Sequence, residues 1–309
     1  MSARPLFWRF FSPIMYAVVP RMQRFMRAPA ARSLKRWWYR CFADPYTNCV
    51  ALPTRATTIF GGRFDGDLSG VVQRSIFHFG LFEPHLTEFL TDRLRPGDTF
   101  VDVGANVGYF SVLASKLVGD GGAVVAVEAS PSTFTALRAT LARNNATNVR
   151  AIEAAAYDCK AMLPIYHLPE ESFTSGASIV RAIGPQEALV AAEPLATLLT
   201  ERELTNARVI KIDVEGAEER AIAGLLPAVH LLPRDVEIVV EVLPESFHAV
   251  LAQLRERGFD ASILDNPLDP LAARAKGSRL QALPAEPSPE KLKMTHGVIY
   301  LVFARASAL

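Results

Sequence analysis

The sequence predicts an α/β protein with an open, mostly parallel sheet that carries helices on both faces. Three observations favour this fold class. From Thr99 onward, short apolar runs alternate with amphipathic runs of helical length. The first apolar run enters a glycine-bearing turn, GANVG, that begins at Gly104. Four expected strands end in an acidic residue or contain one near their C-terminal end, and ligands bind at the carboxyl edge of such sheets.

Length and composition indicate one large domain with accessory segments. The chain has 309 residues, half of them hydrophobic, and 33 basic residues balance 32 acidic ones. This balance argues against a nucleic-acid partner. We expect a basic aromatic arm at 1–48, a cap segment at 49–98 and the main domain at 99–309. The three cysteines form no CxxC pair and no spacing with histidine, so we expect reduced thiols, no metal site and a cytoplasmic protein.

The N-terminal arm is strongly basic. Between Arg4 and Arg40 there are nine Lys or Arg residues and no acid. The uncharged run from Phe10 to Pro20 is about half the length that spans a bilayer. One hypothesis is an interfacial anchor that contacts the inner face of the membrane through residues 4–40. The alternative is an arm that packs its aromatic side chains on the main domain.

Turn residues and apolar runs place the expected elements. In the cap, Gly61-Gly62 and Asp65-Gly66-Asp67 predict one or two short strands before a helix from Pro84 to Leu94. In the main domain, apolar β-branched runs predict strands at Thr99–Val103, Ala123–Val127, Val149–Ala155, Arg208–Ile212, Val236–Val240, Phe259–Leu264 and Val298–Phe303.

Helical periodicity follows most of these strands. Ser130 is a good N-cap and Pro131 suits the first helical position. Helices are expected from the Gly104–Gly108 turn to Leu117, from Ser130 to Asn144, from Leu195 to Glu203, from Ala217 to Leu226 and from Pro244 to Arg257. Asp158–Ile183 is predicted to be a hairpin and a loop, and Asn266–Lys293 a mobile loop.

The acids at the first two strand ends indicate the cofactor. Glu128 ends the second strand, a position from which a carboxylate reaches both hydroxyls of a ribose. The turn lacks the G-x-G-x-x-G fingerprint of pyrophosphate binding, and Asp102 would repel a pyrophosphate. A Walker A lysine is also missing from the turn. Ribose hydroxyls, adenine and a cationic tail together describe S-adenosylmethionine.

Three motifs resemble the FkbM family of S-adenosylmethionine-dependent methyltransferases. They are Asp102–Phe110 (DVGANVGYF), Val127–Pro131 (VEASP) and, most specifically, Ile210–Glu218 (IKIDVEGAE). The resemblance runs from about Phe79 to Phe303 and excludes the arm and the Asn266–Lys293 loop. It implies a Rossmann-like class I methyltransferase fold with a seven-stranded sheet in the order 3-2-1-4-5-7-6, the last strand antiparallel. It also implies methyl transfer, usually to oxygen, on a sugar, glycan, lipid or secondary metabolite.

The glycine turn after the first strand of the main domain predicts residues that bind the cofactor. Gly104 and Gly108 let the backbone approach the methionine tail, and Asp102 organises its ammonium directly or through water. Asn106 contacts the tail or, as an equal alternative, stabilises a left-handed turn. All cofactor-binding candidates are Asp102, Gly104, Asn106, Gly108, Glu128, Ser130 and Asp158.

Two of these candidates lie further along the chain. Ser130 follows the ribose acid, and Ala129-Ser130 departs from the family pattern, which affects the ribose edge only mildly. Asp158 could accept from the adenine amino group or remain an ordinary acid of a surface loop.

The acceptor side is predicted from the fourth strand. We expect Asp213 or Glu215 to orient or deprotonate the acceptor hydroxyl. The alternative is that Asp213 holds the cofactor and Glu215 caps the next helix. Lys211 is expected to form a salt bridge with a neighbouring acid. The candidates for acceptor binding are Glu83, His85 and Glu241.

Two other functions compete with methyl transfer. An NAD- or nucleotide-sugar-dependent enzyme would also have the strand, the glycine turn and an acid that binds ribose. It would, however, need the further glycine of the G-x-G-x-x-G fingerprint, which this turn lacks. A non-catalytic scaffold that binds a membrane or a partner has no need for intact acids at all four strand ends.

Overall fold

The computed structural model describes residues 53–167, 177–182, 184–265, 279–283, 287 and 298–305. The N-terminal arm, and with it the predicted membrane contact, lies outside the described residues. The chain divides into two compact units. The described part of the first is 53–84, and the second begins at residue 85.

The first unit is a hairpin followed by a helix. Strands β1 (Pro53–Thr57) and β2 (Arg63–Asp67) pair antiparallel, as the turn signals predict. Helix α4 (Val71–Phe79) was not predicted, because short-range turn signals dominate this stretch. Its buried side chains recur at helical spacing, and it ends where Gly80 adopts φ 76°.

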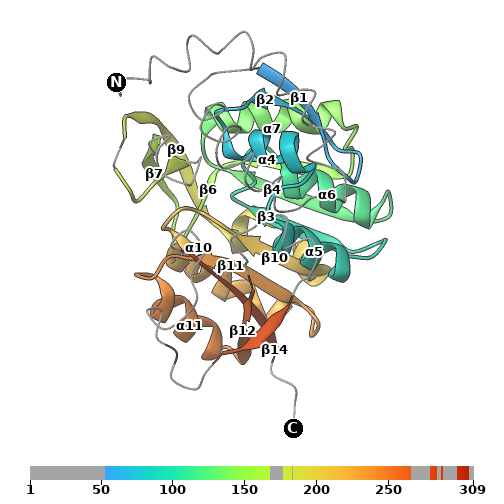
Figure 1. Ribbon diagram of the computed structural model, residues 1–309. Helices are drawn as coiled ribbons and strands as arrows, with labels where there is room; N and C mark the ends of the chain where they lie inside the picture. The colour runs from blue at the N-terminus through green and yellow to red at the C-terminus, as the bar shows by residue number, and fades with distance from the viewer. Residues whose placement is uncertain are drawn as a thin grey trace. The chain divides into compact units, whose positions relative to one another are not determined.

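The second unit is organised around a mostly parallel sheet (Figure 1). Its strands are β3 (Thr99–Val103), β4 (Ala123–Glu128), β5 (Val149–Glu153), β10 (Ala207–Ile212), β11 (Glu237–Val242), β12 (Phe259–Leu264), β13 (Leu280–Ala282) and β14 (Ile299–Arg305). The order is β13-β12-β14-β11-β10-β3-β4-β5, and β14 runs antiparallel between β11 and β12. The predicted order of seven strands is therefore present.

The predicted number of strands is wrong by one within the described residues. Strand β13 pairs antiparallel with β12 and lies inside Asn266–Lys293, which the sequence predicts as a loop. All three of its residues are exposed. A strand without a buried face carries no apolar alternation, so its sequence has no strand signal.

Helices cover both faces of this sheet (Figure 1). One face carries α5 (Pro84–Arg93), α6 (Tyr109–Val118) and α7 (Pro131–Arg143). The other carries α8 (Leu195–Leu198), α9 (Glu201–Thr205), α10 (Glu218–Leu225), the 3₁₀ helix η2 (Leu226–Leu231) and α11 (Phe247–Arg255). The single helix predicted at Leu195–Glu203 is two, because Thr200 and Glu203 form a capping box that starts a new helix.

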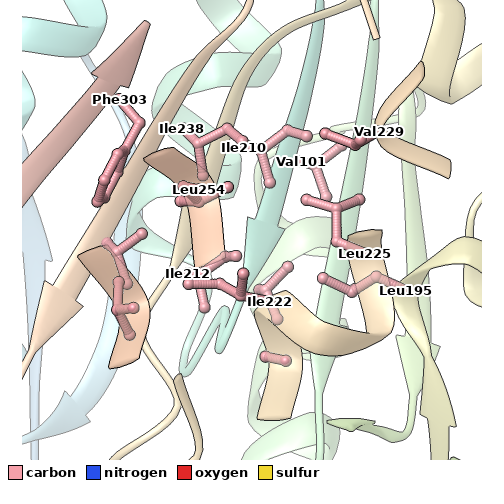
Figure 2. Packing of buried hydrophobic residues seen from close by; sticks show 14 of the residues in the cluster. Val101, Leu195, Ile210, Ile212, Ile222, Leu225, Val229, Ile238, Leu254 and Phe303 are labelled. Carbon is pink, nitrogen blue, oxygen red and sulfur yellow. The ribbon is translucent and has the colours of Figure 1, made fainter. Parts of the chain in front are cut away.

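The main core lies between the sheet and the second group of helices. Figure 2 shows strand residues Ile210, Ile212 and Ile238 facing helix residues, with Ile222 of α10 close to Ile212 and Leu254 of α11 close to Ile238. Successive strand residues point to opposite faces. The intervening Lys211 therefore points to the face of α6, where it lies 5.4 Å from the ring centroid of Phe110.

A second sheet is inserted between β5 and β10. It contains β6 (Ala155–Tyr157), β7 (Ala161–His167), β8 (Ala177–Ser178) and β9 (Gln186–Pro194) in the order β6-β9-β7-β8. The antiparallel pairing of β7 with β8 confirms the predicted hairpin. The strand predicted at Val149–Ala155 is shorter, because the chain passes from β5 to β6 after Glu153.

Within the described residues, every helix is too short or too polar to cross a bilayer.

We expect truncation of a buried core side chain to lower the free energy of unfolding. Ile238→Ala removes a fully buried side chain and should lower the free energy of unfolding by about 2–5 kcal/mol. Leu189→Ala, at a side chain that is 61% exposed, should change it by less than about 0.5 kcal/mol. Urea unfolding monitored by circular dichroism would compare the two, and equal effects would contradict the proposed core.

Candidate functional site

The carboxyl ends of β3, β4 and β10 open on a pocket of about 620 Å³, including its mouth. Gly104, Asn106 and Glu128 line it from the ends of β3 and β4, and Asp213 and Glu215 line it from the turn after β10. The second sheet closes the pocket with apolar side chains that include Ile165, Ala177 and Ile179.

The glycine turn after β3 needs its glycines. Gly104 has φ +75°, and a Cβ there would lie 1.7 Å from the carbonyl oxygen of Asp213. The turns after β3 and β10 are thus in direct backbone contact. Gly108 has φ +87° and abuts Leu137 of α7. Asn106 has φ 50°, and its Oδ1 accepts the Val107 N–H at 2.7 Å, so its predicted role in a left-handed turn is confirmed.

Glu128 is held rigidly at the end of β4. Its Oε2 accepts the Asn106 N–H at 2.8 Å and its Oε1 accepts the Ser130 N–H at 2.9 Å. Burial raises the pKa of Glu128, and these backbone N–H groups and Lys211 oppose the shift. The carboxylate lines the pocket, and each oxygen keeps a further lone pair for a ligand hydroxyl.

Ser130 acts behind this wall rather than on it. It is fully buried, caps α7 by accepting the Thr133 N–H at 3.2 Å, and donates to Glu187 Oε2 at 2.8 Å. Glu187 Oε1 also accepts the Ser132 N–H at 2.9 Å. Burial acts to raise the pKa of Glu187, but hydrogen bonds from Ser132 and Ser130 lower it overall. Glu187 was missed, because a single acid on an inserted strand carries no motif.

A buried lysine joins the turns after β3 and β10. Lys211 Nζ lies 3.4 Å from Asp102 Oδ1 and 3.2 Å from Asp213 Oδ2, and it donates to the Gly104 carbonyl at 3.2 Å. The predicted salt bridge of Lys211 is confirmed. Its position between two acids was not predicted, although a lone lysine between Ile210 and Ile212 in a buried strand was an available signal.

Asp102 is enclosed and does not line the pocket. It has no exposed surface, and its Oδ2 accepts the Ser111 hydroxyl at 2.6 Å. Burial raises the pKa of Asp102, against the charge of Lys211 and the Ser111 hydrogen bond. This geometry offers no direct contact between Asp102 and a ligand ammonium. Asp102 instead holds Lys211 in place.

Glu215 lies on the pocket wall in a constrained turn. Its φ is 52°, and its carbonyl accepts the Ser178 hydroxyl at 2.8 Å. Burial and the neighbouring Asp213 and Glu218 raise the pKa of Glu215 to about 8, against Arg181 and Lys211.

The alternative in which Glu215 caps α10 is wrong. The N-cap of α10 is Ala217, without a side-chain hydrogen bond, and Glu218 Oε1 accepts the Gly216 N–H at 2.6 Å. Glu218 is 2% exposed, and burial raises its pKa to about 7. The sequence motif contained Glu218 but did not mark it as a site residue.

Asp158 lies outside the pocket. Its Oδ2 forms a salt bridge with Arg220 at 2.6 Å, and this hydrogen bond lowers the pKa of Asp158. The structure therefore gives no support to the adenine contact and agrees with an ordinary acid of a loop.

Two of the acceptor candidates meet at the end of β11. The ring of His85 packs edge-on against Tyr300 with centroids 4.6 Å apart, and the Tyr300 hydroxyl donates to Glu241. Burial lowers the pKa of His85 to about 3, so the imidazole is neutral. Tyr300 was missed. Glu83 belongs to the first unit, where it has φ 39°.

No group of three or more His, Cys, Asp or Glu residues in the described part of the chain has the arrangement of a metal site.

Comparison with known proteins decides the family. Residues 102–261, just over half of the chain, match the model of the methyltransferase FkbM domain. The chain belongs to this family. The resemblance of its three motifs is thus confirmed, and methyl transfer replaces the NAD- or nucleotide-sugar-dependent alternative.

Individual relatives agree with this family. The chain is 29% identical over 219 residues to the 31-O-demethyl-FK506 methyltransferase FkbM of Streptomyces tacrolimicus, across 59% of this chain and 83% of that protein. Among solved structures, the precorrin-6y C5,15-methyltransferase of Geobacter metallireducens matches 72% of this chain and 86% of its own, with 17% identity and a TM-score of 0.41. An O-methyltransferase of Thermotoga maritima matches 83% and 79%, with 13% identity and a TM-score of 0.42. Both scores are below 0.5, so the family rests on the sequence match.

S-adenosylmethionine is the cofactor of this methyltransferase family, and the pocket suits it. Glu128, Ile165 and Ile179 line the pocket, so that carboxylate oxygens that could accept ribose hydroxyls and an apolar surface that could cover a purine ring are both present. The glycine turn allows close backbone approach, and Asp213 and Glu215 supply negative charge for a cationic end.

We expect replacement of Lys211 to lower the stability of the protein strongly. Lys211→Met leaves the buried Asp102 without its cation and should cost about 3–5 kcal/mol of unfolding free energy. Adding Asp102→Asn should recover at least about 1 kcal/mol, because the uncompensated charge is then gone. Urea unfolding of the single and double variants would measure both, and a Lys211→Met protein as stable as the wild type would refute this role.

Proposed function

We propose that this protein transfers the methyl group of S-adenosylmethionine to a hydroxyl oxygen of a small molecule, sugar, glycan, lipid or secondary metabolite. The main support is that Glu128, Asp213 and Glu215 line one pocket. The name of the Streptomyces relative, a 31-O-demethyl-FK506 methyltransferase, supports oxygen as the acceptor.

The proposed binding role of Glu128 follows from how it is held. Its oxygens are positioned by two backbone N–H groups, so little conformational entropy is lost when they accept ligand hydroxyls. S-adenosylmethionine, when bound, supplies an activated methyl group on a positively charged sulfur. The acidic wall then stabilises and orients the charged end.

The proposed base is Glu215. An alcohol acceptor must lose its proton, and a base works best when its pKa is near the working pH. The pKa of Glu215 is raised to about 8 by burial and by its acidic neighbours. Asp213 is bound to Lys211 at 3.2 Å, which suits an orienting role. Glu215 is therefore the better candidate to accept the hydroxyl proton.

We place the acceptor beside Asp213, toward β11. Ile212 pairs with Val240, so Asp213 and Glu241 directly follow paired residues at adjacent strand ends. The neutral His85, Tyr300 and Glu241 form a polar cluster there. A neutral imidazole and a phenol suit a hydroxyl-bearing acceptor, since both form uncharged hydrogen bonds.

The ribose assignment is tested by binding. Glu128→Ala should weaken S-adenosylmethionine binding by at least about tenfold, because hydrogen bonds to a charged group are worth about 1.5–3 kcal/mol. Asp158→Asn, outside the pocket, should change the affinity by less than about twofold. Calorimetric titration of both variants provides the comparison, and wild-type affinity in Glu128→Ala would exclude the ribose contact.

The base assignment is tested by turnover. Glu215→Gln should still bind S-adenosylhomocysteine but lower methyl transfer by about 10²–10⁴-fold. Glu219→Gln, an exposed neighbour on α10, should transfer at the wild-type rate. The assay follows tritiated methyl groups into fractionated host glycans, lipids and small metabolites. Label that is found on nitrogen or carbon would overturn O-methylation, and full turnover in Glu215→Gln would overturn the base.

A further inference from the structure

The acidic wall of the pocket holds more carboxylates than its buried lysine can neutralise. Asp213 and Glu215 line the pocket, and Glu218 lies behind them with 2% exposure. Lys211 is already shared between Asp102 and Asp213. The Glu218 carboxyl is hydrogen-bonded to neutral groups, the Gly216 N–H and the Ser246 side chain.

Hydrogen bonds to the backbone hold the turn that carries these carboxylates. Ser178 binds the Glu215 carbonyl, and Glu218 binds the Gly216 N–H. Glu215 is in turn confined to φ 52°. The turn therefore cannot easily relax to separate the acids. Like charges in a buried site cannot all ionise, so such a group retains a proton or attracts a cation.

We propose that Glu215 retains a proton in the free protein, and that binding of the cationic methyl donor expels it. This inference rests on the proposed function and deepens it. Glu215 then becomes a base only when the donor is in place. Glu218 is a positioning residue, since it acts on Glu215 and does not line the pocket.

The protons balance over one cycle. Glu215 releases its proton to solvent as the donor binds. It then takes the proton of the acceptor hydroxyl while the new O–C bond forms and the S–C bond breaks. The sulfur product has lost its positive charge, so Glu215 keeps this proton and is ready for the next cycle. One proton reaches the solvent for each methyl group transferred.

The charged groups around Glu215 agree with this arrangement. Asp213 precedes it in the same turn and Glu218 faces it from α10, while Lys211 faces it from β10 and Arg181 from the segment after β8. Burial and the two acids raise the pKa of Glu215 to about 8. The pKa of Glu218 is raised to about 7, mainly by burial. A bound cation would lower the pKa of Glu215 by stabilising its charged form.

Calorimetry measures the expelled proton directly. S-adenosylmethionine is titrated into the full-length protein at pH 7 in phosphate, HEPES and Tris, which differ in heat of ionisation. The observed heat of binding is plotted against the heat of ionisation of the buffer, and the slope gives the number of protons released per ligand bound. This number should approach one. S-adenosylhomocysteine, which lacks the sulfonium charge, should release much less. Between pH 6 and 7 the Kd for S-adenosylmethionine should fall by up to about tenfold, because the ionised protein binds more tightly.

Three variants locate the proton. Glu215→Gln should bind S-adenosylmethionine without proton release and with a Kd that is independent of pH. Glu218→Gln should release fewer protons at pH 7 when S-adenosylmethionine binds. It should also shift the pH dependence of Kd to lower pH, because Glu215 loses an acidic neighbour that raises its pKa. Glu219→Gln should behave as the wild type.

The outcomes separate the inference from the proposed function. If wild-type protein binds S-adenosylmethionine with the same heat in every buffer, the inference is wrong and the methyltransferase function stands. If wild-type protein binds no S-adenosylmethionine at all, both are wrong. Undiminished proton release in Glu215→Gln would also overturn the inference. The wild-type comparison of the two ligands needs no variant, so a misfolded variant does not remove the test.

Discussion

The buried ammonium of Lys211 is the constraint on which the site depends. It holds Asp102 at the end of β3 and Asp213 after β10, and it binds the Gly104 carbonyl between them. Removing three charged groups from water is costly, so their geometry must be satisfied together. This requirement keeps the turns after β3 and β10 in backbone contact. It also holds Asp213 where it lines the pocket. The same requirement engages the lysine with Asp102 and Asp213, and in our proposal Glu215 then retains a proton until the methyl donor binds.

The inserted sheet stabilises both ends of the pocket. Ile165 and Ile179 cover the cofactor side, while Ser178 holds the Glu215 carbonyl. Glu187 secures the start of α7 through Ser130 and Ser132. A segment that the sequence predicts as a hairpin and a loop therefore supports both Glu128, the proposed ribose-binding acid, and Glu215, the proposed base. Differences in this segment would change binding and catalysis together.

Five acids at the carboxyl edge of one sheet have different roles because their surroundings differ. Asp102 is fully enclosed and holds Lys211, whereas Glu128 is fixed by backbone N–H groups and faces the pocket. Asp213 is bound to the lysine. Glu215 has like charges beside it, and Glu241 accepts a hydrogen bond from Tyr300. The role of each acid therefore depends on its burial and its neighbours, and not on its residue type alone.

The sequence by itself located the central strands and the glycine turn, because strand periodicity and turn residues are local patterns. Its three motifs indicated the family, and the resemblance to that family implied the order of the strands. The sequence also placed Glu128, Asp213 and Glu215 at the edge that forms the pocket. Only the tertiary structure decided that Asp102 faces Lys211, that Asp158 pairs with Arg220, and that Tyr300 joins His85 to Glu241. It likewise revealed Glu187 and strand β13. These features depend on contacts between residues far apart in the chain, or on strands without a buried face, and neither leaves a local periodic signal.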